Sequence, residues 1–155
     1  MRSKILRVIA FVMAYAALSV AAADFSGLAG ASQTGESLLD LIKKGESQSS
    51  GGTSSTIALG VAAGYIHAVR DSNLYNRWNA IAVFKPQLAT AQPGTKEAMA
   101  ELFFCEPAQM SNGQIMAITK NYLEAHPERW NEGAFNLVED AFKKTYPCKT
   151  GDLFR

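Results

Sequence analysis

The sequence has only two histidines and two cysteines among 155 residues, and this scarcity limits the chemistry that it can support. A metal site would have to combine Cys105 or Cys148 with His67 or His126, but none of these four residues stands at a short ligand spacing. No G-x-S-x-G, H-E-x-x-H or glycine-rich phosphate loop is present. We therefore expect no metal, no cofactor and no enzymatic activity.

The remaining acid/base candidates have structural interpretations. His126 immediately precedes Pro127 at an expected helix end, where a cation suits the helix dipole. His67 lies on the flank of an expected helix, where a structural or exposed role is the simpler interpretation. The pair Glu139-Asp140 points in neighbouring directions on a helix and is typical of a solvated face.

No apolar run is long enough to span a bilayer comfortably, which takes about 20 residues, but a shorter run stands at the N-terminus. Three basic residues precede the apolar stretch 8–18, and small residues follow, with Ala21 and Ala23 at the −3 and −1 positions of a signal-peptidase site. This pattern predicts a cleavable signal peptide over residues 1–23, the alternative being a retained N-terminal anchor. We expect the mature chain to work outside the cytoplasm.

Basic residues are not in excess once the signal is removed. All fourteen acidic residues follow Ala23, and twelve of the fifteen basic residues do, so the mature chain has a net charge of −2. No Lys/Arg cluster remains, which argues against nucleic acid or a membrane surface as the partner. Removing 23 of 155 residues leaves 132, the size of one domain.

Both cysteines belong to the mature chain. In an oxidising compartment an even pair is most simply a disulfide, which predicts a Cys105–Cys148 bond. It would close a loop of about forty residues and stabilise the fold by about 3–4 kcal/mol on the chain-entropy model.

Helical periodicity predicts an all-α domain, a small compact bundle of four to five helices closed by one disulfide, over residues 35–149. A flexible mature N-terminus (24–34) precedes it, and a tail (150–155) follows. The expected helices cover 35–44, Ser54 or Ser55 to Arg70, 96–104, a capping box at Ser111 and Gln114 up to Pro127, and Asn131 to Tyr146. Between them lie a Ser/Gly linker (46–55) and the segment 71–92, which has no clean period and is expected to be a broken helix or extended chain ending at Lys85-Pro86.

The expected core combines apolar residues at helical spacing. Phe103 and Phe104 should be buried next to a half-cystine, and the last two helices should pack as an antiparallel hairpin. The stripes that we expect to be buried are Ile57, Val61, Tyr65, Ala68 and Val69 in one helix, and Phe135, Val138, Ala141 and Phe142 in another.

Aromatic residues and a turn-rich segment are the candidates for binding. Tyr75, Trp78 and Trp130 are either interface anchors or parts of the core, because Trp and Tyr dominate both. The segment 85–95 is either a binding loop or a tolerated surface insertion. The residues that we expect to contact a partner are Lys85, Pro86, Gln87, Gln92, Tyr75 and Trp78.

The C-terminal third resembles a known family. It contains Leu102-Phe103-Phe104-Cys105-Glu106-Pro107, then Gln114, then Tyr122-Leu123-Glu124-Ala125-His126-Pro127-Glu128, and it closes with Tyr146-Pro147-Cys148. This is similar to the signature of the Rap/Tai immunity proteins of type VI secretion systems, which show a Cys-x-Pro segment, a Gln on the next helix, a "YL…HPE" helix end and a closing aromatic-Pro-Cys. Upstream, Gly64-Tyr65-Ile66 resembles the family's "GYI" helix.

The resemblance implies a periplasmic, helical and often dimeric protein that binds a peptidoglycan amidase delivered by neighbouring bacteria and occludes its active-site cleft. The sequence departs from the family in two respects. The second cysteine pair of many members is replaced by residues such as Ile42 and Ala62, and Ala68 stands where a Gly is usual. The shared motif consists of scaffold residues and assigns no toxin contact.

Two other functions are compatible with the sequence. A small periplasmic stress chaperone of the acid-resistance kind would release clients at low pH, and with only two histidines its switch would depend on carboxylates. A small hydrolase would lose its activity when His67 or His126 is replaced.

Overall fold

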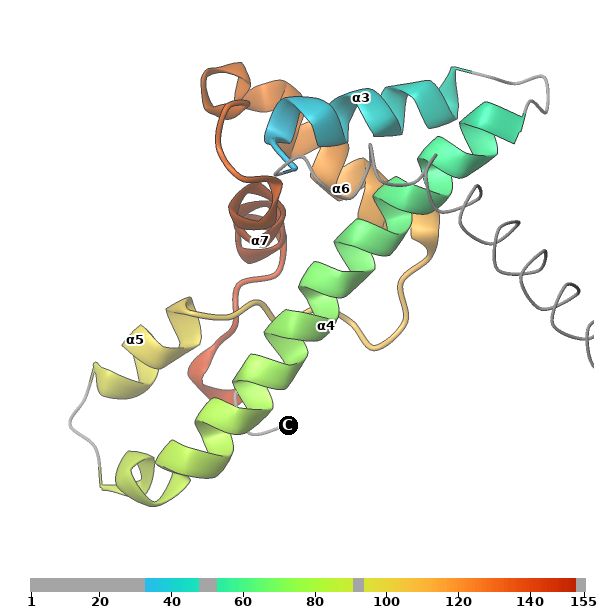
Figure 1. Ribbon diagram of the computed structural model, residues 1–155. Helices are drawn as coiled ribbons and strands as arrows, with labels where there is room; N and C mark the ends of the chain where they lie inside the picture. Colours follow the sequence, from blue (N-terminus) through green and yellow to red (C-terminus); the bar gives the residue numbers. More distant parts are fainter. Residues whose placement is uncertain (1–32, 48–52, 91–93, 153–155) are drawn as a thin grey trace, which may run out of the picture. The chain divides into compact units, whose positions relative to one another are not determined.

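The computed structural model describes residues 33–47, 53–90 and 94–152, and the chain from Gln33 onward forms one compact unit (Figure 1). Its helices are α3 (Gly35–Glu46), α4 (Thr53–Ala89), α5 (Thr95–Glu101), α6 (Asn112–Ala125) and α7 (Ala134–Thr145), with the 3-10 turns η1 (Pro127–Arg129) and η2 (Thr150–Asp152). Within these residues β-structure is limited to two isolated bridges, Thr34 with Gly133 and Phe104 with Pro147. The predicted all-α fold is thus confirmed.

Most of the N-terminal segment covered by the sequence-based prediction is not among the described residues. The signal peptide expected at 1–23 and most of the flexible segment expected at 24–34 lie outside the described residues. None of the described helices is both long and apolar enough to cross a membrane. At the other end of the chain, the tail expected at 150–155 begins with the 3-10 turn η2.

Helix α4 is the longest element, with 37 residues, and it corrects three expectations. Ser54 and Ser55, the expected caps, lie inside the helix. Residues 53–55, expected to end the linker, are also helical, and residues 48–52 lie outside the described residues. The helix does not stop at Arg70 but continues to Ala89, with Pro86 within its last turn. A proline so near the end removes only one backbone hydrogen bond of the final turns, so the helix can contain it.

The buried face of α4 differs from the expected stripe. Ala58, Ala62, Ile66 and Val69 are buried, whereas Ile57 is 46% exposed. The buried residues have the spacing i, i+4, i+8 and i+11, as expected, but the series starts one position later in the sequence than predicted. The reason is that small alanines face α3, which lies close to this part of α4. Gly45 of α3 supports this close approach, since a Cβ there would lie 3.0 Å from Cβ of Leu59.

Helix α3 begins with a capping box in which Thr34 accepts from the amide of Ser37 and the Ser37 hydroxyl accepts from the amide of Thr34. The first turn is also bound to the turn before α7. The amide of Gly35 donates to the carbonyl of Glu132 at 3.0 Å, and that of Glu36 donates to the carbonyl of Trp130 at 3.0 Å. These bonds attach α3 directly to the C-terminal helices.

Helix α6 has the expected capping box at Ser111 and Gln114, and it ends at Ala125, before Pro127. Helix α7 corrects the expected N-cap, because Gly133 and not Asn131 precedes its first turn. Residues 130–133 instead form the turn that receives α3.

Helix α7 also corrects one residue of the expected core. Phe135 is 39% exposed, and Leu137 is buried in its place. The main core lies where α3, α6 and α7 meet the N-terminal half of α4 (Figure 1). Its fully buried large side chains include Leu38, Ile42, Ile66, Phe104, Ile115, Leu123, Leu137, Val138 and Phe142.

The disulfide Cys105–Cys148 is present, as predicted, with a Cα–Cα distance of 4.8 Å. Beside it the amide of Cys105 donates to the carbonyl of Tyr146 at 2.9 Å, so the strand-like segment after α5 pairs with the segment after α7. Phe104 is buried, as expected, and its ring lies 5.1 Å from that of Phe142. Phe103 packs in a second, smaller cluster with Ala100 and Ala80, which joins α5 to the C-terminal half of α4.

Candidate partner-binding surface on helix α4

Three large apolar side chains project into solvent from one face of α4. Leu74, Tyr75 and Trp78 are 44%, 69% and 59% exposed. Their spacing of one, three and four residues places them side by side on the helix. We call these three residues the α4 ridge.

The ridge explains why the sequence between 71 and 92 shows no clean period. Asn73 and Ala80 face the interior, and the ridge residues between them face outward. Because the inward residues are a polar Asn and a small Ala while the large apolar side chains point outward, the segment has no single apolar stripe. An exposed apolar group of this kind is typical of a protein-binding site.

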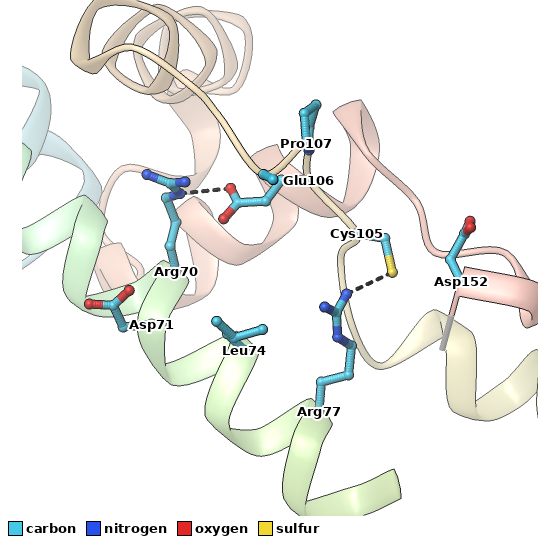
Figure 2. Close-up of a pocket in the computed structure, with 9 residues that line it drawn as sticks. Arg70, Asp71, Leu74, Arg77, Cys105, Glu106, Pro107 and Asp152 are labelled. Carbon is cyan, nitrogen blue, oxygen red and sulfur yellow. Dashed lines mark hydrogen bonds and ion pairs between the residues drawn. The ribbon is translucent and has the colours of Figure 1, made fainter. Parts of the chain in front are cut away.

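A cleft of about 730 Å³ lies next to the ridge, between α4 and the segment that follows Phe104 (Figure 2). Leu74 belongs to both the ridge and the cleft. The residues that line the cleft are Arg70, Asp71, Leu74, Arg77, Cys105, Glu106, Pro107, Ala108 and Asp152.

One wall of the cleft is a chain of hydrogen bonds that begins at Arg70. Its Nε donates to Glu106 Oε2 at 2.7 Å, and its Nη1 lies 3.1 Å from Nδ1 of His67. Arginine can only donate, so Nδ1 of His67 accepts, and its Nε2 carries the proton that reaches Asn112 Oδ1 at 2.9 Å. This arrangement assigns His67 a structural role that links α4 to α6.

Arg77, the second arginine of the cleft, has a weaker hydrogen-bond partner. Nη1 of Arg77 donates to Sγ of Cys105 at 3.0 Å, and sulfur is a weak acceptor. Among the ion pairs of the described residues, none includes Arg77. The two arginines stand about two turns apart on α4, yet within the described residues only Arg70 forms an ion pair with a carboxylate.

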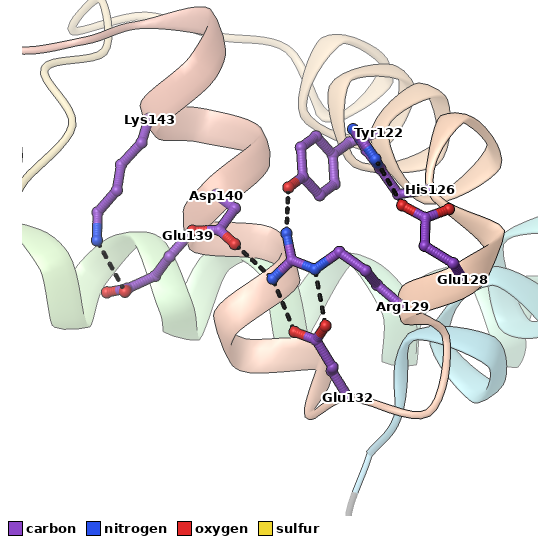
Figure 3. A network of polar contacts seen from close by, with 8 residues as sticks. All are labelled: Tyr122, His126, Glu128, Arg129, Glu132, Glu139, Asp140 and Lys143. Atoms are coloured by element: carbon purple, nitrogen blue, oxygen red, sulfur yellow. Dashed lines mark hydrogen bonds and ion pairs between the residues drawn. The ribbon is translucent and has the colours of Figure 1, made fainter.

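A second polar network lies at the corner between α6 and α7 (Figure 3). Arg129 donates to both carboxylate oxygens of Glu132, at 2.8 and 2.7 Å, to Asp140 at 2.8 Å and to the hydroxyl of Tyr122 at 2.6 Å. These bonds lower the pKa of Glu132 and raise that of Arg129. Partial burial, followed by the charge of Asp140, raises the pKa of Tyr122.

The "HPE" residues belong to this corner and serve the fold. His126 stands at the C-cap of α6, as expected, with its ring 4.5 Å from that of Tyr122 and its Nδ1 3.2 Å from Glu128 Oε1. The pair Glu139-Asp140 is only partly exposed and is used for ion pairs with Lys143 and Arg129. The corner therefore fixes α6 against α7 and leaves no acid/base pair.

The structure separates the predicted binding residues. Tyr75 and Trp78 lie together on the ridge, whereas Trp130 is partly buried and donates its Nε1 to the carbonyl of Leu123 at 2.6 Å. The expected loop is helical from Lys85 to Ala89. Lys85, Pro86 and Gln87 are exposed in the last turns of α4, and Gln92 lies outside the described residues.

Sequence reasoning missed Leu74 and Arg77 as site residues. Both would have been recognised if α4 had been extended past Arg70, because Arg70, Leu74, Arg77 and Trp78 then share a face at i, i+4, i+7 and i+8. In the part of the chain described, no group of three His, Cys, Asp or Glu residues is arranged to hold a metal ion.

A disulfide-closed helical scaffold with an exposed apolar ridge and an adjacent cleft has the features of a protein that binds another protein. The family model of the Rap1a immunity proteins matches residues 34–148, and the chain belongs to this family. It is thus an immunity protein, a class directed against a toxin. No curated protein and no solved structure matches the chain.

Proposed function

We propose that this protein binds a peptidoglycan amidase effector of a type VI secretion system in the periplasm and inhibits it by covering the active-site cleft of the toxin. The observation that carries the proposal is the α4 ridge, where Leu74, Tyr75 and Trp78 are exposed together on a packed helix. Membership of the immunity family supports a toxin as the partner. The Cys-x-Pro, "YL…HPE" and Tyr-Pro-Cys residues support the amidase class through their resemblance to the Rap/Tai proteins.

The proposed mechanism is steric and needs no catalytic group. Buried Trp and Tyr side chains at the centre of an interface commonly contribute at least about 2 kcal/mol each to binding. Trp78 and Tyr75 have most of their surface available for such burial. A cleft beside them would accept side chains of the toxin, which gives the interface shape complementarity as well as apolar area.

The scaffold contributes by holding the ridge in place before binding. The N-terminal half of α4 packs on α3, α6 and α7. Asn73, which directly precedes the ridge residue Leu74, is buried and bonded to the backbone of Phe104. A preorganised surface loses little conformational entropy on association. This is how a small domain can bind a toxin tightly with few contact residues.

The test uses the mature chain, residues 24–155, and a candidate peptidoglycan amidase sought among the reading frames beside its gene. We expect the two proteins to co-purify and the hydrolysis of peptidoglycan to stop in the same samples. Trp78→Ala and Tyr75→Ala should each weaken binding by about 30-fold or more, because a hot-spot side chain is removed. Neither should lower Tm appreciably, since both side chains are exposed.

Val83→Ala is the matched control. Val83 is 61% exposed on the same helix, but it lies about 140° round the helix axis from Trp78. Its binding should stay within about threefold of wild type. The oligomeric state of each variant is measured by light scattering, because the dimer implied by the family resemblance would otherwise confound the affinities.

One outcome of this test would replace the proposed function. If the wild-type chain binds no neighbouring hydrolase but prevents the aggregation of unrelated proteins at low pH, the stress-chaperone function replaces the immunity function proposed here.

A further inference from the structure

Arg77 is the cation of the cleft that lacks an anionic partner within the described residues. To the described residues it donates one hydrogen bond, to the disulfide sulfur of Cys105 at 3.0 Å, whereas a guanidinium has five N–H donors. Arg70, seven residues earlier, shows the contrast, since it is bonded to Glu106 at 2.7 Å. Figure 2 shows both guanidinium groups directed toward the segment 105–107, so they share the cleft.

Resting on the proposed function, we infer that Arg77 is the recognition residue of this surface and that it binds an acidic side chain of the toxin, which enters the cleft beside Leu74. Arginine is enriched among hot-spot residues and pairs with a carboxylate through two parallel N–H···O bonds. The cleft, with about 730 Å³, has room for such a side chain.

The charges around Arg77 are compatible with an incoming carboxylate. Glu106 is neutralised by its ion pair with Arg70. Figure 2 shows the carboxylates of Asp71 and Asp152 pointing away from Arg77. The other lining residues are uncharged, and Leu74, Pro107 and Ala108 are apolar. A partner that covers them would exclude water from a new ion pair, which strengthens it.

The α4 ridge indicates which residues of the toxin lie beside its acidic side chain. Leu74 lines the cleft, and Trp78 follows Arg77 directly in the sequence, so a toxin segment that reaches Arg77 also meets apolar surface. The inferred ligand is therefore an Asp or Glu next to an apolar or aromatic residue on the surface of the amidase. A phosphate-bearing ligand is less suited to the site, because Arg77 is the one cation of the cleft without an ion pair among the described residues.

The experiment measures the affinity of the mature chain for the neighbouring amidase with Arg77→Gln, Arg77→Lys and Lys44→Gln. Arg77→Gln should weaken binding by about 30-fold or more and should flatten its dependence on salt. The affinity of Arg77→Lys should lie between those of wild type and Arg77→Gln, because lysine retains the positive charge but cannot donate two parallel hydrogen bonds to a carboxylate. Lys44→Gln removes one exposed charge from the last turn of α3 and should bind within about threefold of wild type.

A charge-reversal experiment identifies the partner group. Arg77→Glu should abolish binding, and replacing one acidic residue of the toxin with Lys should restore it. The same toxin variants tested against the wild-type chain give the answer even if a substitution at Arg77 disturbs the neighbouring disulfide, which is monitored by thiol titration and Tm.

The outcomes separate the two proposals. If wild type binds the amidase and Arg77→Gln binds within about threefold of it, or if no acidic residue of the toxin rescues Arg77→Glu, this inference is wrong and the immunity function stands. If wild type itself does not bind, the proposed function fails and the inference fails with it.

Discussion

The side-chain amide of Asn73 forms two hydrogen bonds with the backbone of Phe104, in the way that a neighbouring strand would. Its Nδ2 donates to the carbonyl of Phe104 at 3.0 Å, and its Oδ1 accepts from the amide of Phe104 at 3.2 Å. Both residues are buried. This pair joins the middle of α4 to the segment that carries the disulfide, and it lies next in sequence to the cleft residues Leu74 and Cys105.

We expect Asn73→Ala to lower the free energy of unfolding by about 2–4 kcal/mol, because it leaves a buried N–H and a buried C=O of Phe104 without partners. Urea denaturation monitored by circular dichroism measures the change. Asn79→Ala is the control, since Asn79 is exposed on the same helix, and its effect should stay within about 0.5 kcal/mol. Equal effects of the two substitutions would contradict the structural role of the amide.

Gly35 stands where α3 meets the C-terminal helices, and a Cβ there would lie 2.4 Å from Cδ1 of Leu137 and 3.3 Å from Cα of Trp130. We expect Gly35→Ala to destabilise the fold by about 1–3 kcal/mol, because the core must shift to admit the methyl group. Gly64→Ala should do the opposite. Gly64 lies inside α4 with open space around it, and an alanine there favours the helix by about 0.5–1 kcal/mol. Thermal unfolding of both variants decides the signs.

Replacing Cys105 and Cys148 together with alanine should cost about 3–4 kcal/mol on the chain-entropy model, given their separation of 43 residues. Reductant should lower the Tm of the wild-type chain toward that of the double variant. It should leave the Tm of the variant unchanged, because no other disulfide exists in the described residues. A variant that still responds to reductant would refute this account.

Glu132 predicts how the α6–α7 corner responds to acid. Its hydrogen bonds from Arg129 hold its pKa below the ordinary value of 4.5. A carboxyl with a lowered folded-state pKa stabilises the fold above its unfolded-state pKa, and this contribution is lost as the pH falls through the folded-state value. Glu132→Gln should therefore show a smaller decrease of Tm than wild type between about pH 5 and pH 3.

The control for this pH profile is Glu101→Gln in α5. Glu101 is exposed and has no ion pair among the described residues. Its Tm should follow the wild-type pH profile. If Glu132→Gln also followed it, Arg129 would not be holding Glu132 in its charged form in solution.

Local sequence signals predicted the elements whose ends carry strong caps. Ser111 and Gln114 mark the start of α6 because their side chains satisfy backbone groups within one turn, so no tertiary information is needed. The cysteine pair was equally accessible, because only one intramolecular pairing exists. Asn131 failed as a cap because the backbone around it is already used to bind the first turn of α3, a contact nearly a hundred residues away in sequence.

Periodicity failed where large side chains are outside and small ones are inside. Ile57 was predicted to be buried because it is large and apolar, but it is exposed. Ala58 and Ala62 are buried instead, because α3 lies close to α4 there. The α4 ridge was missed for the same reason. Leu74 and Trp78 are large and apolar but exposed, so they disturbed the apolar period of the buried face and were not recognised as a second face. The binding role of Tyr75 and Trp78 stays a prediction, and their shared exposure is what the structure adds.

The disulfide converts the chain between Cys105 and Cys148 into a covalent ring that contains α6, η1 and α7. A single cut by a protease anywhere in that ring opens it but releases no fragment, because both new ends remain attached through the sulfur atoms. A cut in α4 is different, since α4 precedes the ring and has no covalent link to it except through the backbone of α5. The domain is thus protected against fragmentation in its C-terminal half, whereas the segment that carries Tyr75 and Trp78 depends on noncovalent folding and packing for resistance to proteolysis.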